Sequence, residues 1–188
     1  MHFIKHLIIS LFFSLILSSC GHIEDMIIPF TAKPIGQSDK LNAFDRKTDG
    51  DFTAILMIIK NEDEVMEQEK LGKKAIKFRQ IDEIKKGSSG TVMIDLAGCK
   101  PNKNNACEVH GDIVVLDPNG KTYFQQSMIP IMVNDGAIPL KMFRLSAAHL
   151  RISAEKKDVV GKYIIKLKIK DEVANRSVDL ITNFSIIE

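Results

Sequence analysis

Near the end of the chain, apolar and polar side chains alternate along two neighbouring segments, residues 161–170 and 177–187. The apolar positions of this pattern are Tyr163, Ile165, Leu167, Ile169, Val178, Leu180, Phe184 and Ile186. A period of two with one apolar face is typical of a half-buried antiparallel strand pair. Because a short polar loop of residues 171–176 joins the two segments, we predict a β-hairpin.

Further short strands are predicted upstream of the hairpin, separated by turn-forming residues. Their expected ranges are residues 91–96, 107–116, 121–126, 140–145 and 149–153, with turns at 117–120 and 134–136. The turn Asp117-Pro-Asn-Gly120 combines residues that favour tight turns for steric and hydrogen-bonding reasons. Several short strands with turns between them suggest a β-sandwich.

Residues 52–59 form an unbroken apolar stretch, in contrast to the alternating pattern. Its length and β-branched content predict a strand that is covered on both faces. Asn61 then resembles the N-cap of a helix, and Glu64 completes a capping box, so we predict a short helix over 62–71 that ends at Gly72. These patterns together predict an all-β antiparallel sandwich over residues 51–188, with one short helix.

The first 19 residues have the pattern of a secretory signal. Lys5 is the only charged side chain before residue 24, and residues 7–17 are all Leu, Ile or Phe except for two serines. A basic start followed by an apolar run of about 7–15 residues is the form of a signal peptide. The run is shorter than the roughly 20 apolar residues of a membrane span. The alternatives are an uncleaved N-terminal anchor and a buried helix.

The signal ends in Leu17-Ser18-Ser19-Cys20, which resembles the lipobox of bacterial lipoproteins. The resemblance implies cleavage before Cys20 and attachment of lipid to its thiol, which anchors the mature chain in a membrane of the cell envelope. In this family the cysteine amine is also acylated in Gram-negative bacteria. The residue after the cysteine is Gly21 and not Asp. In this family that residue affects the membrane to which the lipoprotein is sorted, so the resemblance implies the outer membrane.

Residues 20–50 are predicted to form a lipidated tether, because Pro29, Pro34 and Gly36 interrupt regular structure. A flexible coil of about 30 residues spans roughly 30 Å, although residues 23–30 are apolar enough for part of the tether to dock on the domain or lie near the membrane. Cleavage would leave 169 residues with 25 basic and 24 acidic side chains. This near-zero charge argues against a nucleic-acid partner.

Two cysteines remain in the mature chain, Cys99 and Cys107, and turn formers and charged residues separate them. An exported chain meets an oxidising compartment, so a disulfide is expected. Closing a loop of about nine residues would stabilise the fold by roughly 2.6 kcal/mol in the chain-entropy model. The alternatives are a metal-binding pair and a redox pair, which the absence of a Cys-x-x-Cys motif disfavours.

A second resemblance concerns the later strands. The turn at 117–120 and the sequence Gly161-Lys-Tyr163 at the start of the penultimate strand resemble an immunoglobulin-like sandwich, which implies that Tyr163 is a tyrosine corner whose hydroxyl bonds to upstream backbone. Residues 90–188 are also similar to small exported proteobacterial proteins of unknown function. The shared features are Gly98-Cys99, Cys107, the turn at 117–120 and Leu145-Ser146. This similarity implies fold and location but no activity.

Candidate chemistry is concentrated in Glu108, His110 and Asp112, which alternate along one predicted strand and therefore share a face. A histidine between two carboxylates can bind a metal or relay a proton, and a metal-dependent hydrolase is the alternative function that this face suggests. The other interpretation is a polar, water-facing strand, because a site needs ligands from a second strand. Motifs for phosphate binding or nucleophilic catalysis are absent from the sequence, so we expect no cofactor.

The leading function is a non-catalytic binding or structural module of the envelope, with an envelope protein as a possible partner. Sandwich domains bind through end loops or by adding a strand at an exposed edge. Residues 127–133 are apolar and contain Pro130, which suits an edge strand. Met128, Ile131 and Met132 are the candidate contact residues, and the alternative is that this segment packs on the core.

Overall fold

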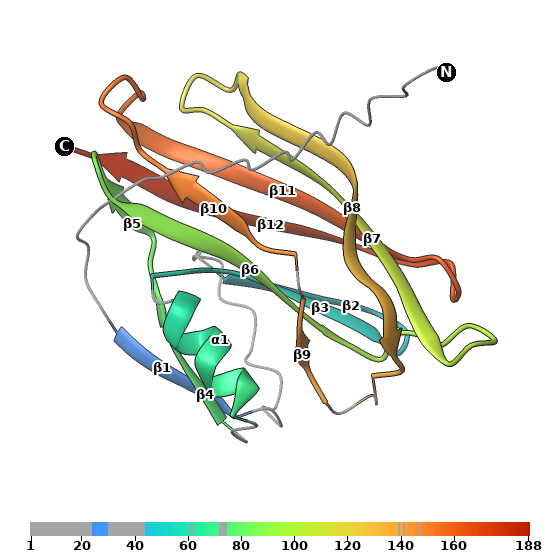
Figure 1. Ribbon diagram of the computed structural model, residues 1–188. Helices are drawn as coiled ribbons and strands as arrows, with labels where there is room; N and C mark the ends of the chain where they lie inside the picture. The colour runs from blue at the N-terminus through green and yellow to red at the C-terminus, as the bar shows by residue number, and fades with distance from the viewer. Residues whose placement is uncertain are drawn as a thin grey trace, which may run out of the picture.

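The computed structural model of the protein describes residues 24–29, 44–60, 62–71, 75–138, 140, 142–146 and 148–188. Its strands form two β-sheets that enclose a common core (Figure 1). In spatial order, the first sheet contains β1 (Glu24–Pro29), β4 (Ala75–Gln80), β3 (Phe52–Ile59), β6 (Ser89–Ala97) and β10 (Leu150–Ser153), with β2 (Phe44–Asp49) beside β3 and β9 (Arg144–Leu145) beside β6. The second sheet contains β5 (Glu83–Lys85), β12 (Arg176–Ile187), β11 (Gly161–Asp171), β7 (Ala106–Leu116) and β8 (Thr122–Gly136). The predicted all-β sandwich with one short helix, α1 (Glu62–Lys70), is therefore confirmed.

The central strand β3 is buried along its whole length, as its unbroken apolar sequence predicts. One set of alternate side chains, including Leu56 and Ile58, faces the core between the sheets. The other set, including Met57 and Ile59, lies in a second cluster with Val65 of α1. Nine residues are too few for a helix to be stable by itself in water, so its packing on the outer face of β3 holds α1 in place.

The hairpin of β11 and β12 is also confirmed. Leu167 lies opposite Leu180 in β12 and opposite Ile113 in β7. Its side chain is buried, whereas Lys166 and Lys168 on either side are exposed. The alternation in the sequence therefore corresponds to an inner apolar face and an outer basic face of β11.

Tyr163 ties this hairpin to the segment before it. Its hydroxyl donates a hydrogen bond to the carbonyl oxygen of Val159 at 3.0 Å, so the predicted bond to upstream backbone is confirmed. Its ring stacks on Phe184 with 5.2 Å between centroids and meets Tyr123 edge-on at 5.3 Å. Burial raises the pKa of the Tyr163 hydroxyl, with the charge of Asp158 acting in the same direction. The hydroxyl therefore stays protonated, and able to donate, throughout the neutral range.

The segment predicted as a tether contributes two strands to the first sheet. β1 pairs with β4 from Glu24 opposite Gln80 to Pro29 opposite Ala75, and β2 pairs with β3. This agrees with the expectation that part of the segment docks on the domain, and it places the start of the sandwich before residue 51. The predicted signal peptide and Cys20 lie outside the described residues. Within those residues, no helix has the length and apolar character needed to cross a membrane.

β2 also links the two sheets, through carboxylates rather than through backbone pairing. The backbone N–H of Ile181 donates to Asp45 Oδ2 at 2.9 Å, and that of Ser177 donates to Asp49 Oδ2 at 3.1 Å. β12 pairs with β5 only through residues 185–187. The two carboxylates therefore occupy part of the edge that β12 would otherwise leave open.

Candidate functional site

Four connecting segments meet at one end of the sandwich, which lies at the lower right in Figure 1. They are the β2–β3 turn, the β6–β7 loop, the residues after β8 and the β11–β12 loop. Between them lies an open pocket of about 560 Å³, whose lining includes Asp51, Lys100, Pro101, Ile138, Leu140 and Arg176. Because binding residues are found disproportionately on loops that a rigid scaffold positions, this pocket is the candidate functional site.

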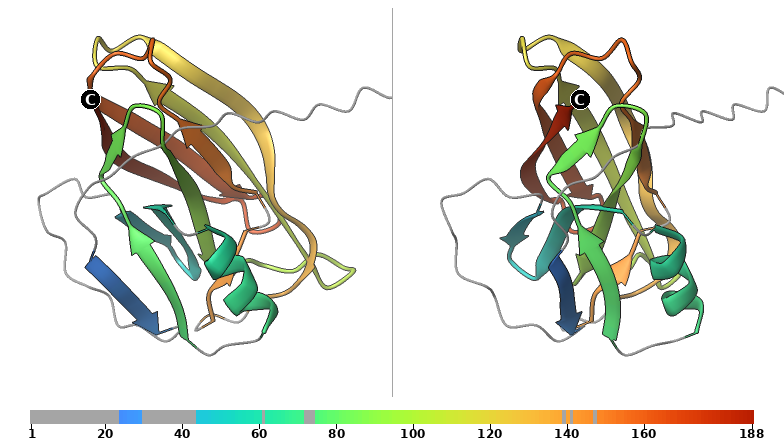
Figure 2. Two further views of the ribbon diagram at one scale, coloured as in Figure 1. Left: turned by 60° about the vertical axis from the view of Figure 1, so that its left-hand side comes forward. Right: turned by 90° about the vertical axis from the view of Figure 1, so that its left-hand side faces the viewer.

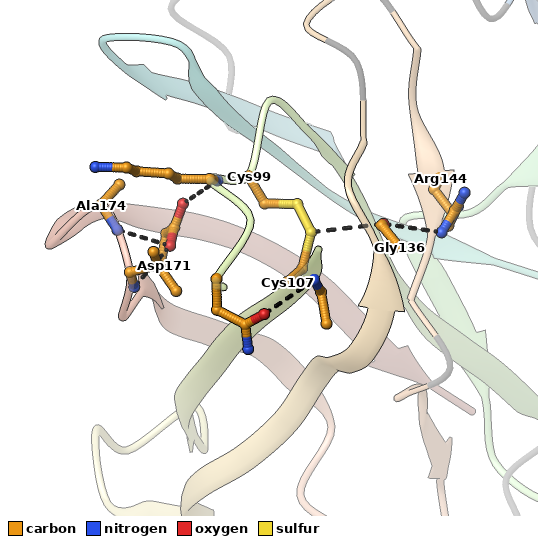
Figure 3. The surroundings of a disulfide bond; sticks show 10 residues. Cys99, Cys107, Gly136, Arg144, Asp171 and Ala174 are labelled. Atoms are coloured by element: carbon orange, nitrogen blue, oxygen red, sulfur yellow. Dashed lines mark hydrogen bonds between the residues drawn. A yellow bond between two sulfur atoms is a disulfide. The ribbon is translucent and has the colours of Figure 1, made fainter. Parts of the chain in front are cut away.

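A disulfide holds the β6–β7 loop at the base of the pocket. Cys99 and Cys107 are joined with 6.0 Å between their Cα atoms, in agreement with the predicted bridge (Figure 3). Within the loop, Asn102 Oδ1 accepts hydrogen bonds from the backbone N–H groups of Asn104 and Ala106, at 2.8 and 3.1 Å. The covalent bridge and these two bonds restrict the shape of the loop.

A buried carboxylate joins this loop to the β11–β12 loop. The side chain of Asp171, at the end of β11, is fully buried. Its Oδ2 accepts from the backbone N–H of Lys100 at 2.7 Å, and its Oδ1 accepts from those of Val173 and Ala174 at 3.0 Å each (Figure 3). Bonds from donors to an ionised acceptor are stronger than neutral ones. One side chain thus fixes two walls of the pocket relative to each other.

The third wall is fixed by close backbone packing. Gly98 has φ +70°, and a Cβ at this position would lie 2.0 Å from the carbonyl oxygen of Asp51. Gly50 has φ +57°, and a Cβ there would lie 2.5 Å from the guanidinium carbon of Arg176. Arg176 also pairs with the carboxylate of Asp51, with 3.4 Å between Nη1 and Oδ2. The contact at Gly98 is with backbone and leaves no room for a Cβ. The contact at Gly50 is with the flexible end of the Arg176 side chain, so glycine is favoured there by its positive φ.

Replacing Asp171 with Asn is expected to lower the free energy of unfolding by about 1.5–3 kcal/mol, because at least one hydrogen bond to a charged acceptor is lost. The amide nitrogen would also face a backbone donor. Urea denaturation with the disulfide intact measures the change. Glu172→Gln is the matched control, since Glu172 forms a solvent-accessible pair with Lys170 that is worth at most about 1 kcal/mol. Equal losses in the two variants would show that Asp171 does not bridge the loops.

Glu108, His110 and Asp112 do lie on one outward face of β7, as predicted. Glu108 accepts a hydrogen bond from the side chain of Asn102, and Asp112 Oδ1 accepts from the backbone N–H of Met128 at 2.9 Å. The neighbouring strand β11 places Lys170 opposite His110 rather than a further ligand. No group of His, Cys, Asp and Glu suited to a metal ion occurs among the described residues. Only Asp112 is exposed, whereas Glu108 and His110 are half-buried and Nδ1 of His110 is buried without a hydrogen-bond partner. The face is therefore polar, as the second interpretation expected, but only partly exposed to water.

His149 lies beside the start of α1. Its Nε2 is 2.7 Å from Glu62 Oε1, and the buried hydroxyl of Thr91 donates to Glu62 Oε2 at 2.7 Å. Glu62 is predicted in the first helical turn from the capping pattern, but its contacts depend on the packing of α1 against β6. Sequence spacing carries no signal for a contact of this kind.

The three candidate contact residues of β8 are separated by the fold. β8 is an edge strand of the second sheet, as Pro130 indicated. The Met128 side chain is 63% exposed, at a bulge where its φ is 55°. The exposed fractions of Ile131 and Met132 are only 1% and 2%, and both belong to the core. Neither of these two is available to a partner, so the structure corrects that part of the predicted contact surface.

Comparison with known proteins adds little to this geometry. No protein-family model matches the chain, and no curated protein matches its sequence. Among solved structures, a family 123 glycoside hydrolase from Clostridium perfringens is similar over 56% of this chain and 22% of that chain. The identity is 11% and the TM-score 0.36. The chain thus spans well under two thirds of the hydrolase, and a likeness this low supports no conclusion about activity.

Proposed function

We propose that the protein is a lipid-anchored module of the bacterial cell envelope that binds a protein partner, without catalysing a reaction, through the pocket at its disulfide end. The observation that carries the proposal is the construction of this pocket. Four separate segments line it, and a disulfide, a buried carboxylate and close glycine contacts fix their positions. Preorganisation of this kind lowers the entropic cost of binding.

The chemistry of the lining favours recognition over catalysis. Most of the lining residues are apolar or small, and the carboxylate of Asp51 is paired with Arg176. Leu140, at the rim, has an exposed fraction of 60%. An apolar surface with a few charges around it is the composition of a protein-binding patch.

The proposal predicts a partner contact that is specific to this end of the sandwich. A photo-crosslinking amino acid at Leu140, introduced in intact cells, is expected to give a discrete crosslinked product with an envelope protein, which mass spectrometry identifies. The same amino acid at Asn119, an exposed residue in the β7–β8 turn at the other end of the strands, is the matched position and is expected to give none.

A pair of charge reversals tests whether the pocket itself makes the contact. Lys100→Glu is expected to remove the product at Leu140, because it reverses a charge in the pocket lining. Lys121→Glu, a change at an exposed lysine of the opposite end, is expected to leave the product in place. Crosslinking from Asn119 to the same partner, or loss of the product in both variants, would contradict a pocket-specific contact.

A further inference from the structure

We infer that the sandwich is held close to the anchoring membrane, with the pocket at its membrane-distal end, so that the partner approaches from the aqueous side. The inference rests on the proposed lipid anchor at Cys20. The domain then has a fixed orientation relative to the membrane, instead of moving freely on a flexible tether. One end of the strands faces lipid and the other faces the partner.

The first step is the short distance between the anchor and the first strand. Four peptide units separate Cys20 from Glu24, where β1 begins. Even a fully extended chain of that length spans at most about 14 Å, compared with the roughly 30 Å expected of a free coil of about 30 residues. β1 is paired with β4 through six residues, so any flexible tether between the anchor and the domain ends at Glu24.

The second step is the position of Glu24 relative to the pocket. Glu24 lies opposite Gln80 of β4, and Gln80 lies opposite Ile59 at the last position of β3. The other end of β3 begins at Phe52, directly after Asp51 in the pocket lining. Seven residue steps of about 3.3 Å place the two ends of this strand roughly 23 Å apart.

The figures show the same polarity. In Figure 1, β1 and the upper end of β4 lie at the left, and the β2–β3, β6–β7 and β11–β12 connections lie at the lower right. The left view in Figure 2 also shows β1 well apart from the β6–β7 connection. Because about 14 Å of chain is shorter than about 23 Å of strand, a lipidated Cys20 cannot bring its anchor to the pocket.

The consequence concerns the kind of partner. Lipid of the anchoring leaflet lies near the Glu24 end, and the pocket lies at the opposite end of β3. The occupant of the pocket is therefore a protein that reaches the domain from solution or from another layer of the envelope, rather than lipid or a protein buried in the same leaflet.

Depth-dependent fluorescence quenching tests this orientation. The full-length acylated protein, purified from membranes, is reconstituted in phosphatidylethanolamine and phosphatidylglycerol vesicles that contain headgroup spin-labelled lipid. A fluorescent amino acid is placed either at Asp82, two residues after Gln80, or at Lys103 in the β6–β7 loop; both positions are exposed. We expect quenching of several-fold at Asp82 and none at Lys103.

An insertion variant tests the same orientation by lengthening the chain between the anchor and β1. Twenty Gly and Ser residues placed between Ile23 and Glu24 add roughly 25 Å of flexible reach and leave β1 intact. The quenching at Asp82 is then expected to disappear while the protein still floats with the vesicles. Quenching at Lys103 equal to that at Asp82, in protein that floats, would overturn the orientation alone. Failure of the acylated protein to float would overturn the proposed anchor and, with it, this inference.

Discussion

Replacing both Ile131 and Met132 with lysine is expected to unfold the domain. The side chains of both residues are buried in the core, and Ile131 packs over Gly111 of β7. Two ammonium groups there would have no partner, and the effective penalty is several kcal/mol per buried charge. Since a domain of this kind has only about 5–15 kcal/mol of stability, the variant should lose its near-ultraviolet circular dichroism and its cooperative melting transition.

Met128→Lys is the control for this experiment. Met128 lies in the same strand, and its side chain is largely exposed. Its hydrogen bond to Asp112 is donated by the backbone N–H, which the substitution leaves in place. This variant should therefore keep its melting temperature within a few degrees. A double variant that melts like the wild-type protein would mean that the side chains of Ile131 and Met132 do not lie in the core.

Leu167→Ala is expected to lower the free energy of unfolding by roughly 2–5 kcal/mol, because it removes a large buried side chain and leaves a cavity. Leu167 is 1% exposed and lies at the centre of the second sheet, between Leu180 and Ile113. Urea denaturation of the oxidised protein measures the change.

Lys168→Ala is the matched control, one position along the same strand. Its side chain is exposed on the opposite face of the sheet, and substitutions at such positions usually change stability by less than about 0.5 kcal/mol. Comparable losses at Leu167 and Lys168 would contradict the inward and outward assignment of β11.

The parts of the fold that were predictable are those whose periodicity is regular. β11 and β12 alternate along most of their length, β3 is continuously apolar, and α1 carries its own capping pattern, so the predicted and observed ranges of each agree closely. Local chemistry was sufficient because one strand period or one cap determines each of these elements. The cysteine pair was predictable for a similar reason, since short spacing and an exported chain favour a bridge.

β8 was predictable only in part, because its pairing with β7 is irregular. The register shifts between Val109 and His110, where Met132 and Pro130 are the respective partners. A bulge inserts an extra residue and breaks simple alternation, so Ile131 and Met132 are both buried although they are consecutive. Sequence periodicity alone assigns neighbouring residues to opposite faces and cannot detect this.

The candidate site was not predictable from the sequence, because its residues come from four distant segments. Asp51, Lys100, Ile138 and Arg176 lie on different connections and share no spacing pattern. Asp171 reads in sequence as the first residue of a polar loop, but the fold buries it beneath the disulfide loop. Only the arrangement of the strands brings these positions together.

The carboxylates of Asp45 and Asp49 have a further consequence, for self-association. Fibril growth begins when a strand of one molecule finds a row of free backbone donors and acceptors on another. Along β12, the N–H groups of Ile181 and Ser177 already bind these two side chains. A second molecule could extend the sheet at this edge only after β2 had been displaced. Substituting the aspartates would free these two N–H groups, and we therefore expect it to increase aggregation of the protein.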